Sequence, residues 1–107
     1  MAFYMFQVGY SAAGTKAMVE HPQNREEIAR KAAESLGGRL HSFYFSFGEF
    51  DAVLIAEMPD SIGAAAIAMG VGSTGAFSKF QTTALMTAAE GMEAMKKAKS
   101  FSYTPPR

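Results

Sequence analysis

Apolar residues recur along the chain with two different periods, which predict strands separated by helices. Residues 3–10 are aromatic or aliphatic almost throughout, with Gln7 the exception, and this is typical of a strand at the centre of a sheet. Residues 42–47 and 50–55 are rich in aromatic and β-branched side chains and predict two further strands. Residues 76–86 have the same character and predict the fourth strand.

The first helical segment covers residues 11–36, where apolar residues recur at helical spacing among charged ones. Pro22 interrupts this segment because proline lacks the backbone N–H that a helix interior needs. We therefore expect a short helix up to about residue 20 and a longer one from residue 23. The pair Gly37-Gly38 is expected to end the longer helix.

Two further helices are predicted from their capping residues. Asp60 is the expected N-cap of the first, in which Ile62, Ala66 and Met69 form one apolar stripe. Its opposite side is also apolar, so we expect this helix to be covered all round. The run Thr87-Ala88-Ala89-Glu90 matches a capping box and predicts a helix over residues 87–99.

The second and third strands are expected to form a hairpin around Gly48-Glu49. A two-residue loop with positive φ at Gly48 would place Phe47 opposite Phe50. The pairs of Phe45 with Ala52, Phe43 with Leu54, Tyr44 with Val53 and Ser42 with Ile55 would then follow. Both faces of this hairpin are largely apolar, so each face needs a cover.

The resulting βαββαβ order predicts an α+β, ferredoxin-like fold with a four-stranded antiparallel sheet and an extra C-terminal helix. Its helices would cover one face of the sheet only. The other face would be buried by a second copy, giving a homodimer built as a dimeric α/β barrel that could associate further. We expect a single domain over residues 1–107, with a core over 3–86, a helix over 87–99 and a tail over 100–107.

Composition restricts the partners of this domain. The chain has 107 residues, with ten Lys and Arg against ten Asp and Glu, which disfavours nucleic acid and anionic membranes as partners. It has no cysteine, and its first residues lack the basic start of a signal peptide, so a cytoplasmic location is expected. Residues 61–78 carry no charge, but their alanines and glycines favour a short buried helix and a turn over a membrane span.

Three short motifs carry a resemblance to a known family. They are Gly37-Gly38-Arg39-Leu40, Phe43-Tyr44 and Gly48-Glu49-Phe50-Asp51. With Arg25 in the helix and Met58-Pro59-Asp60 after the third strand, the chain resembles the GYD-domain family over roughly residues 3–85. Phe50 stands where the family has a tyrosine, so no role of that hydroxyl carries over.

The Gly-x-aromatic-Asp turn also resembles the effector-binding domain of Lrp/AsnC-type regulators. That resemblance implies a dimeric α/β barrel that binds small metabolites. The DNA-binding helix-turn-helix of those regulators has no counterpart in this sequence.

Asp51, His41 and Tyr44 are the first candidates for ligand contacts. Asp51 could orient a ligand or act as a general base, although an aspartate beside a hairpin more often satisfies backbone donors. His41 alternates with Phe43 on the second strand and could titrate near neutral pH. Tyr44 could donate to a ligand, but a buried ring bonded to the backbone is the commoner arrangement.

A second set of candidates is polar and lies on strands. Gln7, Lys79, Gln81 and Thr83 alternate along the first and fourth strands, which are neighbours in this fold, so they are expected to share a face. Ser46 lies opposite Asp51 in the predicted register and completes the ligand-binding candidates. The same residues could instead face water at a sheet edge.

No metal site and no cofactor are predicted. The glycines of Gly70-Val71-Gly72-Ser73-Thr74-Gly75 match a dinucleotide-binding pattern, but they follow a helix instead of opening one, which favours a helix end and turn. Neither histidine has a cysteine, aspartate or second histidine at ligand spacing.

Three hypotheses of function remain open from the sequence. The first is a homodimeric module that binds or senses a small molecule. The second is a cofactor-independent enzyme of the oxygenase or isomerase type, which requires Asp51, His41 or Tyr44 to converge on a cavity. The third is a structural accessory subunit of a larger assembly, suggested by the apolar second helix and the methionines of the C-terminal helix.

Overall fold

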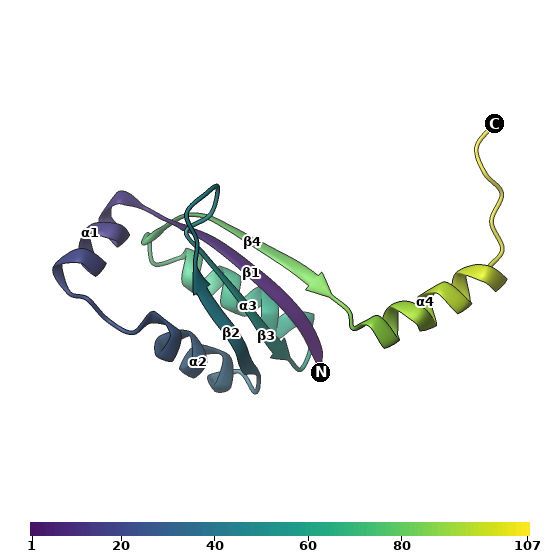
Figure 1. The fold of residues 1–107 in the computed structure, drawn as a ribbon, viewed down its shortest axis with the longest axis horizontal. Coiled ribbons are helices and arrows are strands. Elements are labelled where there is room, and N and C mark those ends of the chain that lie inside the picture. The colour runs from purple at the N-terminus through teal and green to yellow at the C-terminus, as the bar shows by residue number, and fades with distance from the viewer.

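The computed structural model describes residues 1–107 and contains one antiparallel sheet with the strand order β2-β3-β1-β4 (Figure 1). The strands are β1 Ala2–Tyr10, β2 Arg39–Phe45, β3 Ala52–Met58 and β4 Phe77–Leu85. β1 pairs with both β3 and β4, so the most apolar strand is central, as predicted. The α+β, ferredoxin-like fold is confirmed.

The helices are α1 Ala12–Glu20, α2 Arg25–Ser35, α3 Ser61–Gly72 and α4 Ala88–Ser100. The interruption at Pro22 is confirmed, because α1 ends before it and α2 begins after it. The Asp60 side chain accepts a hydrogen bond from the Gly63 N–H at 2.9 Å, which confirms it as N-cap. The capping box of Thr87 and Glu90 is also present. None of the four helices combines the length and the hydropathy of a membrane-spanning segment.

The core lies between one face of the sheet and the helices α2 and α3. Phe6 of β1 and Met58 of β3 are its largest fully buried side chains. Ala33 of α2 and Ala64 of α3 pack against them, and these small residues let the helices approach the strands closely. Because side chains alternate along a strand, the neighbours Met5 and Val53 face away from this core.

The expectation that α3 is covered all round was wrong. Ile62 is 77% exposed and Met69 is 75% exposed, and Ala64 is the only fully buried residue of the helix. The helix contacts β3 and β4 through one side only, and no second layer of this chain covers the other side. The prediction that the outer side of α3 is apolar is confirmed, and the prediction that this side is buried was wrong.

The hairpin register is confirmed, but the predicted turn is wrong. Phe45 pairs with Ala52 and Tyr44 with Val53, as expected. The Ser46 N–H donates to the Asp51 carbonyl at 2.9 Å, so residues 47–50 form a four-residue loop and Phe47 does not pair with Phe50 in the ladder. Positive φ occurs at Gly37 and Gly75 and not at Gly48. The longer loop spreads the reversal over four residues and removes the need for a left-handed glycine.

We expect Gly48→Ala to change the free energy of unfolding by less than about 0.5 kcal/mol, because a Cβ at this position meets nothing within 4 Å. Gly37→Ala, at a φ of +80°, is expected to cost about 1 kcal/mol or more through backbone strain. Urea denaturation of both variants measures the difference. Equal losses for the two would show that Gly48 adopts a left-handed conformation after all.

The sheet face opposite the helices carries no helix of its own chain. A row of facing residues crosses it, in which Tyr44 pairs with Val53, Val53 with Gln7, and Gln7 with Gln81. The next row contains Ser42, Ile55, Met5 and Thr83. Met5, Val53 and Ile55 form an apolar patch on its two central strands beside Gln7, and the polar Ser42, Gln81 and Thr83 lie on its edge strands; we call this surface the open face.

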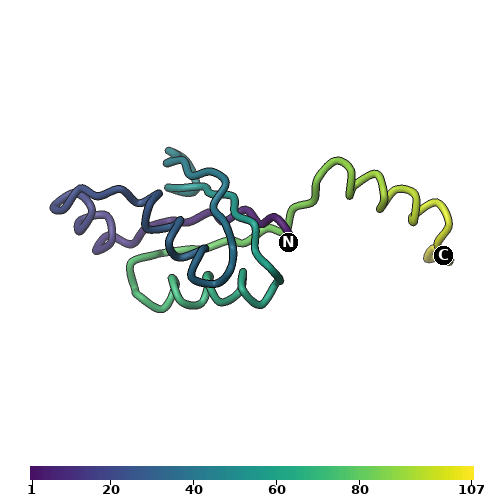
Figure 2. The backbone as a smooth tube through the Cα atoms, turned by 90° about the horizontal axis from the view of Figure 1, so that it is seen from below, coloured from purple at the N-terminus to yellow at the C-terminus, as the bar shows by residue number.

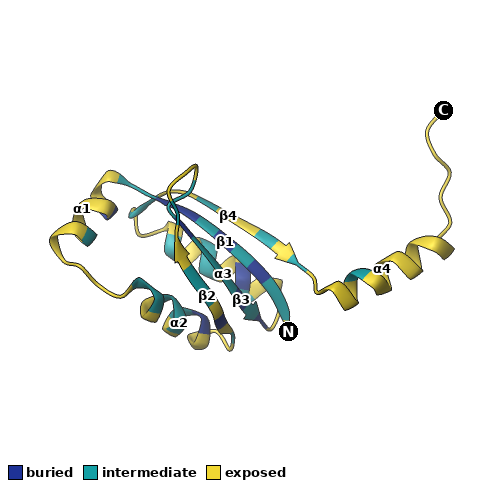
Figure 3. Ribbon diagram, viewed as in Figure 1, coloured by how far each residue is buried: buried dark blue, intermediate teal, exposed yellow.

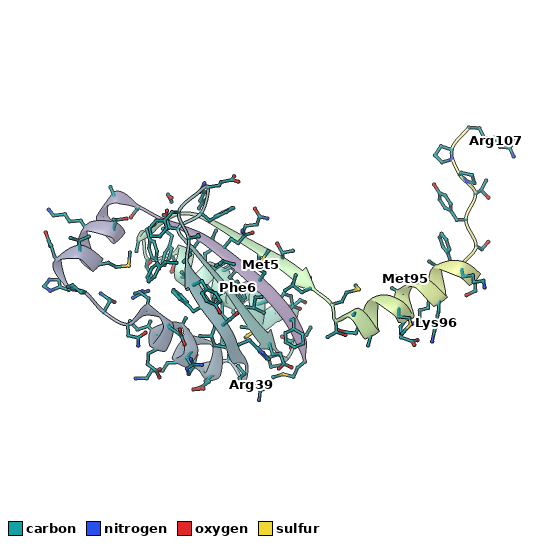
Figure 4. The ribbon with its side chains drawn as sticks, viewed as in Figure 1. Met5, Phe6, Arg39, Met95, Lys96 and Arg107 are labelled. Atoms are coloured by element: carbon teal, nitrogen blue, oxygen red, sulfur yellow. The ribbon has the colours of Figure 1, made fainter.

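Helix α4 projects away from the domain and has no buried residue (Figures 2 and 3). Figure 4 shows Met95 and Lys96 on this helix, distant from the side chains of the sheet and of α2 and α3. The radius of gyration is 17.0 Å, compared with about 13 Å for a compact domain of this length. The amphipathic helix thus packs against nothing in its own chain.

Candidate functional site

Two hollows and one cavity lie near the end of the sheet where β1 finishes and the β2–β3 loop begins. The first hollow, of about 480 Å³, lies between α1, the start of α2 and this loop. The second, of about 460 Å³, lies on the open face under the same loop. The cavity, of about 90 Å³, lies between the sheet, α2 and α3. This end of the molecule is the candidate site.

Asp51 fixes the β2–β3 loop to the end of β1. Its backbone N–H donates to the Val8 carbonyl at 2.7 Å, and its Oδ2 accepts from the Tyr10 N–H at 2.8 Å. The β1–β3 ladder has its last pair at Val8 and Ala52, so the carboxylate replaces the next strand partner. The prediction that Asp51 satisfies backbone donors is confirmed, but the donor belongs to a strand 41 residues away instead of to the turn itself.

We expect Asp51→Ala to lower the free energy of unfolding by about 1–3 kcal/mol, because it leaves the partly buried Tyr10 N–H without an acceptor. Asp51→Asn keeps an acceptor oxygen and is expected to lose less. Glu49→Ala, in the same loop, is the control and should leave stability unchanged, because Glu49 is exposed and makes no hydrogen bond. Chemical denaturation of the three variants tests this order, and equal stability of Asp51→Ala and Glu49→Ala would refute it.

Ser46 and Gln7 are brought together in the hollow on the open face, with Gln81 beside them. The Ser46 Oγ donates to the Phe50 carbonyl at 2.7 Å, so this hydroxyl helps to hold the loop closed. Lys79 places its Nζ 4.8 Å from the centre of the Phe50 ring, which leaves its charge at the edge of the same hollow. The strand register confirms the expectation that Gln7, Lys79, Gln81 and Thr83 share one face of the sheet.

His41 lies at the other end of the sheet. Its Nε2 donates to Glu57 Oε1 at 2.7 Å, and its ring packs edge-on against Phe3 at 4.9 Å. The hydrogen bond from His41, together with the electrostatic effects of His41 and Arg39, holds the pKa of the Glu57 carboxyl below its ordinary value against the opposing effect of desolvation. His41 therefore belongs to a hydrogen-bonded cluster with Glu57 and Arg39, outside the candidate site.

The predicted regular alternation of side chains along β2, from His41 to Phe43, was wrong. The register shifts between Leu40 and Ser42, which is a β-bulge, and this turns His41 toward the open face while Phe43 packs on the core. The expected burial of Tyr44 was also wrong, because its side chain is 67% exposed on the edge strand β2. Tyr44 lies on an edge strand, so no neighbouring strand covers its ring on the outer side.

The cavity on the helix side was not predicted from the sequence. Fourteen of its fifteen lining residues are hydrophobic, and the exception is Arg25. Arg25 also lines the first hollow, together with Tyr10, so the cavity and the hollow share these two residues. Arg25 lies at the start of an apolar stripe that continues at helical spacing through Ile28, Ala29 and Ala32. A cationic residue on an apolar helix face was the feature of the sequence that could have indicated this site.

These features define a ferredoxin-like α+β domain with one open sheet face and an apolar cavity under its helices. The chain belongs to the GYD domain family, whose model matches residues 4–95. The resemblance expected from the glycine and aromatic motifs is confirmed. No curated protein matches the chain significantly.

Two solved structures, MtbAldR and FFRP-DM1, share the fold. MtbAldR is 16% identical with a TM-score of 0.61, and the match covers 80% of this chain and 52% of MtbAldR. FFRP-DM1 is 13% identical with a TM-score of 0.54, and the match covers 80% of this chain and 100% of FFRP-DM1. The chain thus spans about half the length of MtbAldR, and at these identities the likeness concerns the fold.

Proposed function

We propose that the protein is a homodimeric module that binds or senses a small molecule. The observation that carries this proposal is the meeting of an apolar cavity and an open hollow at Arg25 and Tyr10. Small-molecule sites are concave and mostly apolar, with a few polar groups that fix the orientation of the ligand. The fold shared with regulator domains supports the same assignment.

The open face supports the homodimer. Its central residues Met5, Val53 and Ile55 are apolar, and no helix of the chain covers them. Two such sheets packed face to face would bury these residues together and would close the hollow around Gln7, Ser46 and Lys79 between the subunits. A second copy of the chain is the simplest cover, because one interface then serves both subunits.

The enzyme hypothesis required Asp51, His41 or Tyr44 to converge on one cavity. Asp51 lines the first hollow, whereas His41 lies with Glu57 at the opposite end of the sheet and Tyr44 is exposed on an edge strand. The geometry therefore favours binding over catalysis. The cytoplasmic location stays a prediction.

The accessory-subunit hypothesis keeps a specific observation in its favour. Met92 and Met95 of α4, and Ile62 and Met69 of α3, are exposed and have no partner in the chain. A 13-residue helix without tertiary contacts is only marginally stable in water, so α4 gains from docking on another chain.

Sedimentation at micromolar concentration together with a thermal-shift screen of metabolites tests the proposal. We expect the mass of a dimer and at least one compound that raises the melting temperature. A monomer that no compound stabilises would contradict the proposal. A stable complex with an unrelated protein, without any stabilising compound, would favour the accessory subunit.

A further inference from the structure

Arg25 is placed where a cation is unfavourable for the folded chain itself. It is the first residue of α2, and the N-terminal end of a helix carries partial positive charge that repels a cation. Its side chain is partly buried and lines an otherwise apolar cavity. Neither the helix N-terminus nor the apolar cavity stabilises the positive charge of the guanidinium. A negatively charged ligand from outside the chain would stabilise it.

Arg25 takes no part in the ion pairs of α2. Arg30 binds Glu26 at 2.8 Å and Glu27 at 3.6 Å, which uses both acidic residues of the first turn. No carboxylate oxygen lies within 4.0 Å of the Arg25 guanidinium. The hydrogen bond that Arg25 makes through its side chain runs from Nη1 to Gln23 Oε1 at 2.8 Å. A guanidinium has five N–H donors, so most of them stay free for a ligand.

The single positive charge of Arg25, at the mouth of the cavity, favours a carboxylate as the ligand group. One planar guanidinium matches one carboxylate through two parallel hydrogen bonds. Arg25 is the only cationic residue lining either the cavity or the first hollow, and Asp51 adds a negative charge to that hollow. A phosphate, with up to two negative charges, would meet a single cation and a nearby carboxylate there, so a singly charged anion fits better.

The size of the cavity limits the apolar part of the ligand. An apolar cavity of roughly 150 Å³ holds one benzene molecule, and the volume here is about 90 Å³. We propose that this cavity, with Arg25 at its mouth, binds monocarboxylates whose apolar body has about three to five carbon atoms. This inference rests on the proposed function, since it names the ligand class of that same site.

Butyrate and its neutral isostere butyramide, titrated into the full chain and followed by NMR chemical-shift changes, test the proposal. We expect butyrate to shift the signals of Ile28, Ala29 and Ile67, which line the cavity, and to bind at least tenfold more tightly than butyramide. Added salt should weaken the binding of butyrate and leave that of butyramide unchanged.

Three variants locate the site. Arg25→Gln should reduce butyrate binding to the level of butyramide, whereas Arg30→Gln, which removes a cation that is already paired on the same helix, should leave it unchanged. Ala32→Leu places a larger side chain in the cavity and should abolish binding of both compounds. The melting temperature of each variant shows that the fold is kept.

The outcomes separate this inference from the proposed function. Equal affinity for butyrate and butyramide would overturn the selection by Arg25 and leave a small-molecule module in place. Unchanged butyrate binding in Ala32→Leu would place the ligand elsewhere and overturn the inference. If neither compound binds while the metabolite screen finds a stabilising compound of another class, the inference fails alone; if the screen also finds nothing, both fail.

Discussion

Replacing Phe6 with alanine is expected to lower the free energy of unfolding by about 3–5 kcal/mol. Phe6 is 0% exposed and lies in the central strand β1, where its ring packs edge-on against Phe80 at 5.9 Å. Removing the ring takes away the energy of its burial and leaves an empty volume that the rigid sheet cannot close. A loss of this size is a large fraction of the 5–15 kcal/mol that usually stabilises a domain.

Phe47→Ala is the matched control for this prediction. Phe47 is 102% exposed at the tip of the β2–β3 loop, so its loss should change the stability by less than about 0.5 kcal/mol. Thermal and urea unfolding of both variants measure the difference. A small effect of Phe6→Ala would mean that the core between the sheet and α2 and α3 is not the main source of stability.

Phe6 also lines the cavity, so its replacement has a second consequence. The volume left by the ring would join the existing 90 Å³. If the chain stays folded, a larger monocarboxylate such as benzoate should bind Phe6→Ala better than it binds the unaltered protein. This result would link the stability of the core to the size of the ligand.

Replacing Ile55 with lysine is expected to convert a dimer into monomers at micromolar concentration. Ile55 pairs with Met5 at the centre of the open face, and a buried unpaired ammonium there would cost several kcal/mol in a face-to-face interface. Because the lysine would point to solvent in the monomer, the fold itself should survive. Sedimentation and circular dichroism measure the mass and the fold separately.

Ile62→Lys is the control for the interface. Ile62 is a second isoleucine without a cover in its own chain; it is exposed, whereas Ile55 is half-buried, and it lies on the outer side of α3. If Ile62→Lys dissociates the dimer and Ile55→Lys does not, the subunits associate through α3. If neither variant changes the mass, the exposed methionines of α4 become the remaining candidate for association.

The capping residues show what local sequence alone can predict. Asp60 and Thr87 each accept a backbone N–H three residues ahead, so the interaction that starts the helix is contained within one turn. The break at Pro22 is equally local, because it follows from the missing N–H of one residue. Predictions of this kind did not depend on the rest of the chain.

The candidate site was predicted less well, and Asp51 and Arg25 show the reason. Asp51 was identified from its place beside a hairpin, but its partner is the N–H of Tyr10, which only the pairing of β1 with β3 brings near. Arg25 was noted only as part of a family resemblance. Its role follows from a cavity over the central strands, between α2, which packs mainly on β2, and α3, which packs mainly on β4.

The sequence by itself determined the βαββαβ order, the central place of β1 and the pairing of β2 with β3, because alternating apolar residues and capping groups act over a few residues. The tertiary structure decided three further features. It set the length of the β2–β3 loop, it turned His41 to the open face through a bulge, and it left Ile62 exposed on α3. Each of these depends on contacts between segments distant in the chain, and a residue's local pattern contains no information on what will cover it.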